Sequence, residues 1–241
     1  MLIYGINPVL EALKARRVTS LRIAARADDR IREIERVAAS QGVAVRRVDA
    51  DELDRAAGGS RHRHQGVIAE AAEAAIRDVE DLITAAAGVP LIVVLDGIED
   101  PHNVGAILRT VDAAGADGDV RQSRHAAPLG GATAKASAGA VAHVKVADVV
   151  NIARALEALK EAGVWTVGLA GDAAKRYDQI DYRVPTALVV GAEGTGLRRL
   201  VRERCDWLVS IPMSGHVQSL NVSVATGIVL FEAVRQRRPN G

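Results

Sequence analysis

Three polar segments carry the side chains best suited to chemistry, and each follows a stretch that resembles a strand. The first, residues 95–110 (LDGIEDPHNVGAILRT), contains Asn103, Gly105 and Arg109. An arginine fixed on a helix beside a loop asparagine is suited to binding a phosphate or a ribose. Each residue also has a simpler interpretation, because Asn103 alone is typical of a helix N-cap and Arg109 of a solvated helix surface.

The second segment, residues 189–197 (VVGAEGTGL), is a glycine-rich turn that carries one carboxylate. Gly191, Gly194 and Gly196 allow the backbone to turn sharply and to approach a ligand closely. Their spacing is GxxGxG, which is not the GxGxxG dinucleotide fingerprint, and no phosphate-loop lysine follows. Glu193 is therefore either an exposed carboxylate or a ligand of a substrate.

The third segment, residues 211–232 (IPMSGHVQSLNVSVATGIVLFE), passes from a strand through a polar loop into a long apolar helix. Ser219, Asn221 and Ser223 lie within five positions, which is more hydrogen-bonding groups than one helix cap uses. The backbone groups of Ile211 and Leu220 are available to an adenine ring. The surplus of polar groups predicts a ligand site, and helix capping is the alternative.

Alternating strand and helix patterns position these segments. Residues 91–95 are a continuous apolar run, typical of a strand buried on both faces of a parallel sheet. Similar runs separated by helical patterns predict an α/β domain with a mainly parallel sheet over residues 89–241. Ligands of such sheets bind beyond the carboxyl ends of the strands, where all three segments lie. Residues 119–125 (DVRQSRH) are too polar for a central strand, so we predict poor order or an edge position there.

The first part of the chain reads as a separate module. Residues 1–72 predict a small N-terminal α/β domain, and residues 73–88 predict a linker and a helix. Residues 1–70 hold 13 Lys and Arg against 10 Asp and Glu, a mild basic excess that fits a nucleic-acid partner without requiring one. The candidate phosphate contacts, for which solvated surface charge is the alternative, are Arg46, Arg47, Arg61, His62, Arg63 and His64.

Composition excludes several other classes. The chain has 241 residues and a net charge of +1, so it is not a polycation. Cys205 is the only cysteine, which rules out an intrachain disulfide, and we interpret it as a packed residue near a helix end. The sequence has no apolar run of membrane-spanning length and no signal-peptide pattern. We therefore expect a cytoplasmic protein with no membrane partner and no metal.

The joint order of the motifs is more specific than any one of them. The series N-x-G-x-x-x-R, G-x-E-G-x-G-L and I-P-M-x-G-x-x-x-S-L-N-V-S-x-A closely resembles the three motifs of the SpoU/TrmH-type RNA 2′-O-ribose methyltransferases of the SPOUT superfamily. IYGINPVLEAL (3–13) and HQGVIA (64–69) resemble the ends of that family's substrate-binding domain, which is similar to the ribosomal L30e fold. DPHNVGAILRT and GHVQSLNVSVA are most similar to the branch that methylates a guanosine of 23S ribosomal RNA.

This resemblance implies a cofactor, a fold and a set of site residues. The cofactor is S-adenosylmethionine, bound in a deep trefoil knot of the C-terminal SPOUT domain, and the family forms homodimers. The implied cofactor contacts are Leu169, Gly171, Gly191, Gly196, Ile211 and Leu220. The implied catalytic residues are Arg109, Asn103, Glu193, Ser219 and Asn221. Because arginine is too basic to act as a base at neutral pH, we expect Arg109 to polarise the ribose hydroxyl beside an RNA phosphate; deprotonation by Arg109 is left open.

Other assignments stay open at this point. In the family the C-terminal helix, residues 222–236, lies at the dimer interface, but ordinary core packing explains its apolar residues equally well; these are Val222, Val224, Ile228, Val229 and Phe231. The substrate is ribosomal RNA, 23S by resemblance, and a tRNA 2′-O-methyltransferase or an antibiotic-resistance ribosomal RNA methyltransferase are alternatives. From other classes, the intact motifs count against a non-catalytic RNA-binding protein. The missing GxGxxG counts against a nicotinamide-dependent dehydrogenase.

Overall fold

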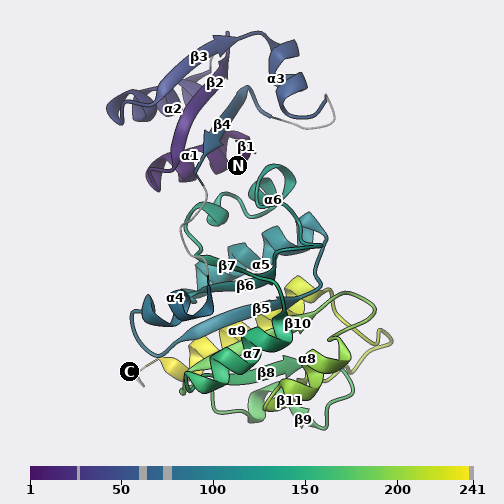
Figure 1. Cartoon of the computed structure of the whole chain (residues 1–241). Coiled ribbons are helices and arrows are strands. Elements are labelled where there is room, and N and C mark those ends of the chain that lie inside the picture. Colours follow the sequence, from purple (N-terminus) through teal and green to yellow (C-terminus); the bar gives the residue numbers. More distant parts are fainter. Residues whose placement is uncertain (26–27, 60–63, 73–77, 239–241) are drawn as a thin grey trace. The chain divides into compact units, whose positions relative to one another are not determined.

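The computed structural model describes residues 1–25, 28–59, 64–72 and 78–238 (Figure 1). The chain divides into two compact units. The first consists of Met1–Ala75 with Pro128–His143, and the second of Ile76–Ala127 with Val144–Gly241. The local sequence pattern does not predict that residues 128–143 group with the first unit.

The first unit is built on a four-stranded sheet with the order β1-β4-β2-β3. Strand β4 is antiparallel to both β1 and β2, and β2 is parallel to β3. The elements are β1 (Leu2–Tyr4), α1 (Ile6–Lys14), β2 (Val18–Ala24), α2 (Asp29–Ser40), β3 (Ala44–Val48), α3 (Ala50–Ala56), β4 (Val67–Ala71), α6 (Gly131–Ala136) and the short 3-10 helix η1 (Ala140–Ala142). Helix α6 packs on β1, where Gly130 lies so close that a Cβ atom would stand 2.4 Å from the Leu2 carbonyl oxygen.

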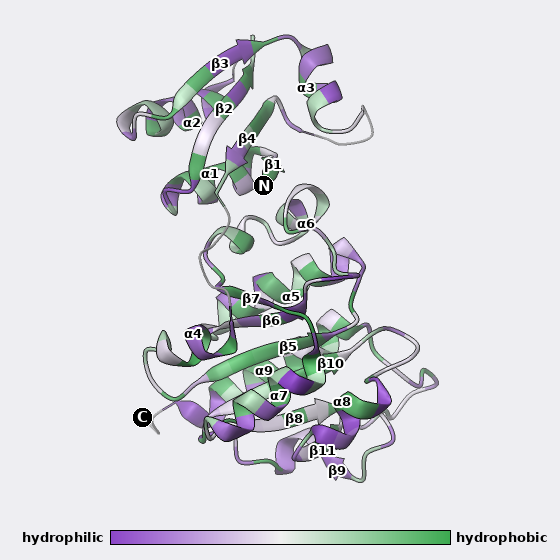
Figure 2. Ribbon diagram, viewed as in Figure 1, coloured by the Kyte–Doolittle hydropathy of each residue, from purple (hydrophilic) through white to green (hydrophobic). Residues whose placement is uncertain are grey.

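The second unit holds a seven-stranded sheet whose described pairs are all parallel, which confirms the predicted α/β class. The strand order is β7-β6-β5-β10-β8-β11-β9. The strands are β5 (Leu91–Asp96), β6 (Gly118–Gln122), β7 (Val146–Val149), β8 (Trp165–Leu169), β9 (Lys175–Arg176), β10 (Thr186–Gly191) and β11 (Trp207–Ser210). Central strand β5 is apolar over most of its length (Figure 2), as expected for a strand covered on both faces.

Helices cover both faces of this sheet. They are α4 (Val79–Thr84), α5 (Pro101–Ala114), α7 (Ile152–Glu161), α8 (Arg199–Arg204) and α9 (Val222–Arg237), with a 3-10 helix, η2 (Tyr177–Gln179). Leu82 of α4, Leu156 of α7 and Val201 of α8 share one apolar core with residues of the central strands. Helices α5 and α9 pack against each other, and α9 also packs on β10. The carboxyl ends of the strands and the first residues of the helices that follow them therefore lie at the same edge of the sheet.

The prediction for residues 119–125 is wrong, because Gly118–Gln122 form β6 between β5 and β7. Backbone pairing with two neighbours outweighs the low strand propensity of the polar side chains. Val120 enters the apolar core, and Arg121 binds Asp148 at 2.8 Å. Asp119 is fully buried, and within the described residues neither carboxylate oxygen has a hydrogen-bond partner. Burial raises the pKa of Asp119 to about 8, an effect that Asp148 increases and Arg121 opposes.

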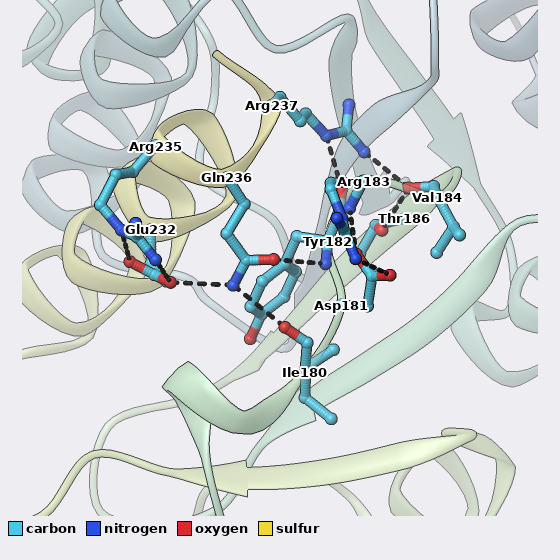
Figure 3. Close-up of polar contacts among 10 residues, drawn as sticks. All are labelled: Ile180, Asp181, Tyr182, Arg183, Val184, Thr186, Glu232, Arg235, Gln236 and Arg237. Atoms are coloured by element: carbon cyan, nitrogen blue, oxygen red, sulfur yellow. Dashed lines mark hydrogen bonds and ion pairs between the residues drawn. The ribbon is translucent and has the colours of Figure 1, made fainter. Parts of the chain in front are cut away.

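The C-terminal end of α9 is fastened to the opposite edge of the sheet by one guanidinium group (Figure 3). Arg237 donates from Nε to the Tyr182 carbonyl at 2.7 Å and from Nη1 to the Val89 carbonyl at 2.6 Å. Its Nη2 donates to the carbonyls of Pro90 at 3.0 Å and Val184 at 2.8 Å. These contacts hold the long helix in register with the amino ends of β5 and β10.

Candidate active site

A cavity of about 950 Å³ lies at the carboxyl ends of β8, β10 and β11. Three loops meet around it, namely residues 169–172, 190–197 and 209–220. A cavity of this size is suited to a small-molecule cofactor. All six residues predicted to contact the cofactor line it: Leu169, Gly171, Gly191, Gly196, Ile211 and Leu220.

The glycine-rich turn forms one wall of the cavity. The Gly196 amide donates to the Ala192 carbonyl at 2.8 Å, and Gly196 itself has a left-handed φ of 67°. A Cβ atom on Gly191 would stand 2.1 Å from the Gly196 carbonyl carbon. No side chain fits at Gly191 unless the turn moves, so the glycine is required by this close approach.

An ion pair between a buried carboxylate and a half-exposed arginine anchors the end of this turn to the central strand. Asp96 is fully buried at the end of β5, and it accepts the Arg198 backbone amide at 2.7 Å and Nε at 2.6 Å. This pair was not among the predicted site residues. The available signal was a carboxylate at a strand end and an arginine directly after the glycine-rich turn.

A chain of polar side chains links the three motifs. Asn221 donates from Nδ2 to Asn103 Oδ1 at 2.8 Å, and Asn103 donates from Nδ2 to Glu193 Oε2 at 3.4 Å. The second contact is long for a hydrogen bond, whereas the first has ordinary geometry. Three of the five predicted catalytic residues, far apart in the sequence, therefore meet through their side chains.

The helix starts explain why both asparagines are available for this chain. Asp100 caps α5 by accepting from the amides of His102 and Asn103, each at 3.2 Å. Asn103 is thus not the cap, and its side chain is free to bridge two motifs. Asn221 does cap α9, since its Oδ1 accepts the Ser223 amide at 2.9 Å. Its Nδ2 still donates to Asn103, so capping does not prevent Asn221 from contacting the first motif.

The remaining two predicted catalytic residues take no part in this series of hydrogen bonds. Ser219 lines the cavity, is exposed, and makes no hydrogen bond to any described residue. Arg109 is exposed on α5 and is not among the residues that line the cavity. Over the ranges that the structure describes, its guanidinium has no ion pair or hydrogen bond. Within one polypeptide chain, Arg109 therefore lies outside the cavity.

A second charged pair lines the cavity and was not predicted. Arg202 donates to both oxygens of Asp172, at 2.8 and 3.0 Å. This hydrogen bonding lowers the pKa of the Asp172 carboxyl group, which stays ionised at neutral pH. Because Arg202 compensates the charge of Asp172, the negative charge that suits a positively charged ligand comes from Glu193, which has no ion pair within the described residues.

The candidate phosphate contacts of the first unit are engaged with acidic neighbours where they are described. Arg46 pairs with Glu52, and Arg47 pairs with Glu35 at 2.7 Å. His64 Nε2 lies 3.2 Å from Asp54 Oδ1, and its Nδ1 accepts the Gly66 amide. Arg61, His62 and Arg63 lie outside the described residues.

Other chemistries find little support in the described part of the chain. Cys205 ends α8 and is half-buried, and burial raises the pKa of its thiol to about 12, as expected of a packed rather than a nucleophilic cysteine. Among the described residues, no three His, Cys, Asp or Glu side chains are grouped to hold a metal ion. No helix within those residues is long and apolar enough to cross a membrane.

Comparison with known proteins identifies the class. Residues 90–231 match the SpoU rRNA Methylase family, and residues 2–76 match the RNA 2′-O ribose methyltransferase substrate-binding family. The chain belongs to the SpoU rRNA methylase family.

The matches extend over nearly the whole chain. It is 44% identical over 243 residues to the 23S rRNA (guanosine-2′-O-)-methyltransferase RlmB of Pseudomonas aeruginosa, covering 98% of this chain and 97% of that one. It is 46% identical over 240 residues to the Burkholderia protein of the same name, covering 98% and 96%. The solved SpoU methyltransferase AviRb of Streptomyces viridochromogenes, in complex with AdoMet, matches with a TM-score of 0.82 at 28% identity, covering 98% and 90%.

Proposed function

We propose that this protein transfers a methyl group from S-adenosylmethionine to the ribose 2′-hydroxyl of a guanosine in 23S ribosomal RNA. The observation that carries the proposal is the hydrogen-bonded chain of Asn221, Asn103 and Glu193 beside a cavity lined by every predicted cofactor residue. The names of the relatives at 44% and 46% identity support the substrate. A tRNA substrate remains the alternative, and mapping of the methylated RNA distinguishes the two.

The residues of the cavity fit this cofactor. The backbone on the opposite side of the turn comes so close to Gly191 that a side chain is excluded there, and the turn presents main-chain groups to the cavity. Ile211 and Leu220 offer apolar contacts and backbone groups, while Glu193 offers negative charge. When bound, the cofactor supplies an activated methyl group on a sulfonium, so the protein's task is mainly alignment.

The polar chain and Arg109 act on the acceptor side. Asn103 and Asn221 hold Glu193 and each other in fixed positions, which orients the ribose without reorganisation during the reaction. Arg109 polarises the 2′-hydroxyl from beside an RNA phosphate and stabilises the developing negative charge on the oxygen. Ser219, exposed in the cavity, contributes a hydroxyl to the same region.

We further propose that the protein is a homodimer in which Arg109 serves the cavity of the partner. Two observations support this: Arg109 is exposed outside the cavity of its own chain, and α9 is apolar on its outer side as well. Val224 is 50% exposed and Phe231 is 45% exposed, two turns apart on one face of the helix, while Val222 and Val229 face the core. An apolar outer face of this kind fits a self-complementary interface.

Arg109→Ala is expected to lower methyl transfer about a hundredfold, as for other single transition-state donors, while S-adenosylmethionine binds with unchanged affinity. Labelled cofactor and total RNA, followed by mapping of the modified ribose, measure the transfer, and calorimetry measures cofactor binding. Arg154→Ala removes an exposed arginine from α7 and serves as the matched control. Wild-type turnover in the Arg109 variant would rule out its catalytic role.

Mixing two inactive variants tests whether Arg109 acts across a dimer. Gly191→Ala should abolish cofactor binding, because the added methyl group collides with the turn. If Arg109 acts in the partner's site, a dimer of one Arg109→Ala chain and one Gly191→Ala chain has one intact site of two. That site combines the cavity of the Arg109→Ala chain with the arginine of the Gly191→Ala chain. Random assortment should then restore about a quarter of the wild-type rate. A rate no higher than that of either variant alone would place Arg109 in its own chain's site.

The finer features of the fold belong to this proposal as well. We infer that the loops around the cavity form a deep trefoil knot, and that the N-terminal module, residues 1–72, is an L30e-like RNA-binding domain. The match of residues 2–76 to the substrate-binding family supports the second inference. Because the proposed substrate is ribosomal RNA, we place the protein in the cytoplasm, with no metal required by the reaction.

A further inference from the structure

A second, smaller cavity of about 280 Å³ lies on the other side of the glycine-rich turn. It is lined by the ends of three neighbouring strands and the loops that follow them: Asp96 and Glu99 after β5, Gln122 and His125 after β6, and Arg198 after β10. The strand order reverses here, since β6 and β7 lie on one side of β5 and the later strands on the other. Such switch points are where open α/β sheets bind ligands.

The two cavities share a wall. Ala192, Thr195 and Gly196 line both of them. Glu193, which joins the polar chain with Asn103, lies within the same turn. A group held in the smaller cavity is therefore next to the turn that borders the cofactor cavity on its other side. The volume is near the lower limit for a small-molecule site, which suits one nucleobase better than a whole cofactor.

The polar side chains of the smaller cavity fall into two groups. Asp96 pairs with the half-exposed Arg198 and compensates its charge, so neither side chain offers a ligand an unbalanced charge. The side chains of Glu99, Gln122 and His125, by contrast, make no hydrogen bond or ion pair with any residue in the described ranges. His125 also has a left-handed φ of 54°, a conformation that is uncommon for residues other than glycine and is concentrated at functional sites.

This set of groups does not suit an anion. Asp96 neutralises Arg198, and Glu99 then leaves a negative charge beside the neutral amide of Gln122. A phosphate would be repelled. A nucleobase edge that presents two adjacent N–H donors fits instead, because a carboxylate has two acceptor oxygens and no donor. Guanine offers such an edge with N1–H and its N2 amino group, whereas adenine, cytosine and uracil each place an acceptor next to a single donor.

Resting on the function proposed above, we propose that this cavity holds the guanine base of the acceptor nucleoside. Glu99 accepts from guanine N1–H and N2–H, and the Gln122 amide donates to guanine O6. Proteins read single-stranded RNA through unstacked bases in this way, by hydrogen bonds to the Watson–Crick edge. The base then lies on one side of the 192–196 turn and the methyl donor on the other, so base recognition also positions the ribose.

The test compares three RNA substrates with guanosine, inosine or adenosine at the mapped position. Inosine retains N1–H and O6 but lacks the N2 amino group. For the wild type, kcat/KM should fall about tenfold with inosine and more with adenosine. Glu99→Gln should lower kcat/KM on the guanosine substrate by about ten- to hundredfold, the range for one bidentate base contact. The same variant should lose much less on the inosine substrate.

Two controls separate recognition from other effects. Glu161→Gln changes an exposed carboxylate at the end of α7 and should leave all three rates unchanged. Cofactor affinity and melting temperature of Glu99→Gln should equal those of the wild type, because Glu99 is exposed and outside the cofactor cavity. If the wild type methylates the guanosine but Glu99→Gln shows an equal rate and an equal guanosine-to-inosine ratio, the base-site proposal is overturned. If the wild type methylates no RNA, the proposed function itself fails.

Discussion

Asp119→Val is expected to raise the free energy of unfolding by about 4 kcal/mol at pH 7, from the pKa shift of this buried carboxyl group. The wild-type side chain is fully buried in β6, and no described residue bonds its oxygens. Valine has a shape suited to strands and adds no polar atom to the core. Urea unfolding of both proteins at several pH values measures the difference.

The raised pKa of Asp119 decides how the stability of the wild type changes with pH. The pKa of Asp119 is raised from 3.8 to about 8 by burial. Between these values the folded chain binds more protons than the unfolded chain, so the wild type loses stability as the pH rises through this window. The advantage of Asp119→Val should therefore grow from about pH 4 to about pH 8 and then level off.

Two control variants show whether the charge or the packing is responsible. Asp119→Asn removes the titration but keeps an unpaired polar group, so it should be flat with pH and less stable than the valine variant. Asp112→Asn removes the same charge from the exposed side of α5 and should have little effect. An equal advantage for Asp119→Val at pH 4 and pH 8 would contradict a buried, titrating carboxyl group.

Arg237→Ala is expected to lower the free energy of unfolding by about 3 kcal/mol, because several charged hydrogen bonds are lost at once. Four carbonyls accept from this guanidinium, which ties the end of α9 to segments before β5 and before β10. Burial lowers the pKa of Arg237 because desolvation disfavours the charged guanidinium. The hydrogen bonds to the four carbonyls offset this desolvation. Thermal and urea unfolding measure the change.

The neighbouring arginine offers the matched control. Within the described ranges Arg235 is exposed and pairs only with Glu232 one turn away, so Arg235→Ala should change the free energy of unfolding much less than Arg237→Ala. Arg237→Lys keeps the charge but cannot reach four acceptors with one ammonium group, so its loss should be intermediate. Equal free energies of unfolding for Arg237→Ala and Arg235→Ala would show that the hydrogen bonds from Arg237 to the four carbonyls do not stabilise the fold.

The sequence predicted the class of the catalytic fold because its signal is local. Continuous apolar runs such as Leu91–Leu95 mark buried parallel strands whatever their neighbours are. Residues 118–122 gave no such signal, since their strand is held by pairing with β5 and β7 rather than by their own composition. The grouping of residues 128–143 with the first unit is likewise a property of long-range packing.

The candidate site was predictable to the extent that its motifs are contiguous. Most cavity-lining residues lie within the second and third motifs or at the end of β8, where sequence order alone indicates convergence, whereas Arg202 lies on α8 and the first motif contributes none. The sequence left the cap of α5 open, because Asp100 and Asn103 are both good caps and only geometry decides between them. Pairs such as Asp96 with Arg198 lie about a hundred positions apart, so no local pattern connects them.

The placement of Pro128–His143 limits how the N-terminal module can be isolated. This stretch groups with Met1–Ala75, and the covalent chain joins the two units at three points. During translation the first unit therefore remains incomplete until His143 has been synthesised, after β5 and β6 are already made. A fragment that stops at residue 75 lacks the helix that packs on β1. An autonomous RNA-binding fragment has to carry residues 128–143 through a designed connection, and a simple truncation does not provide it.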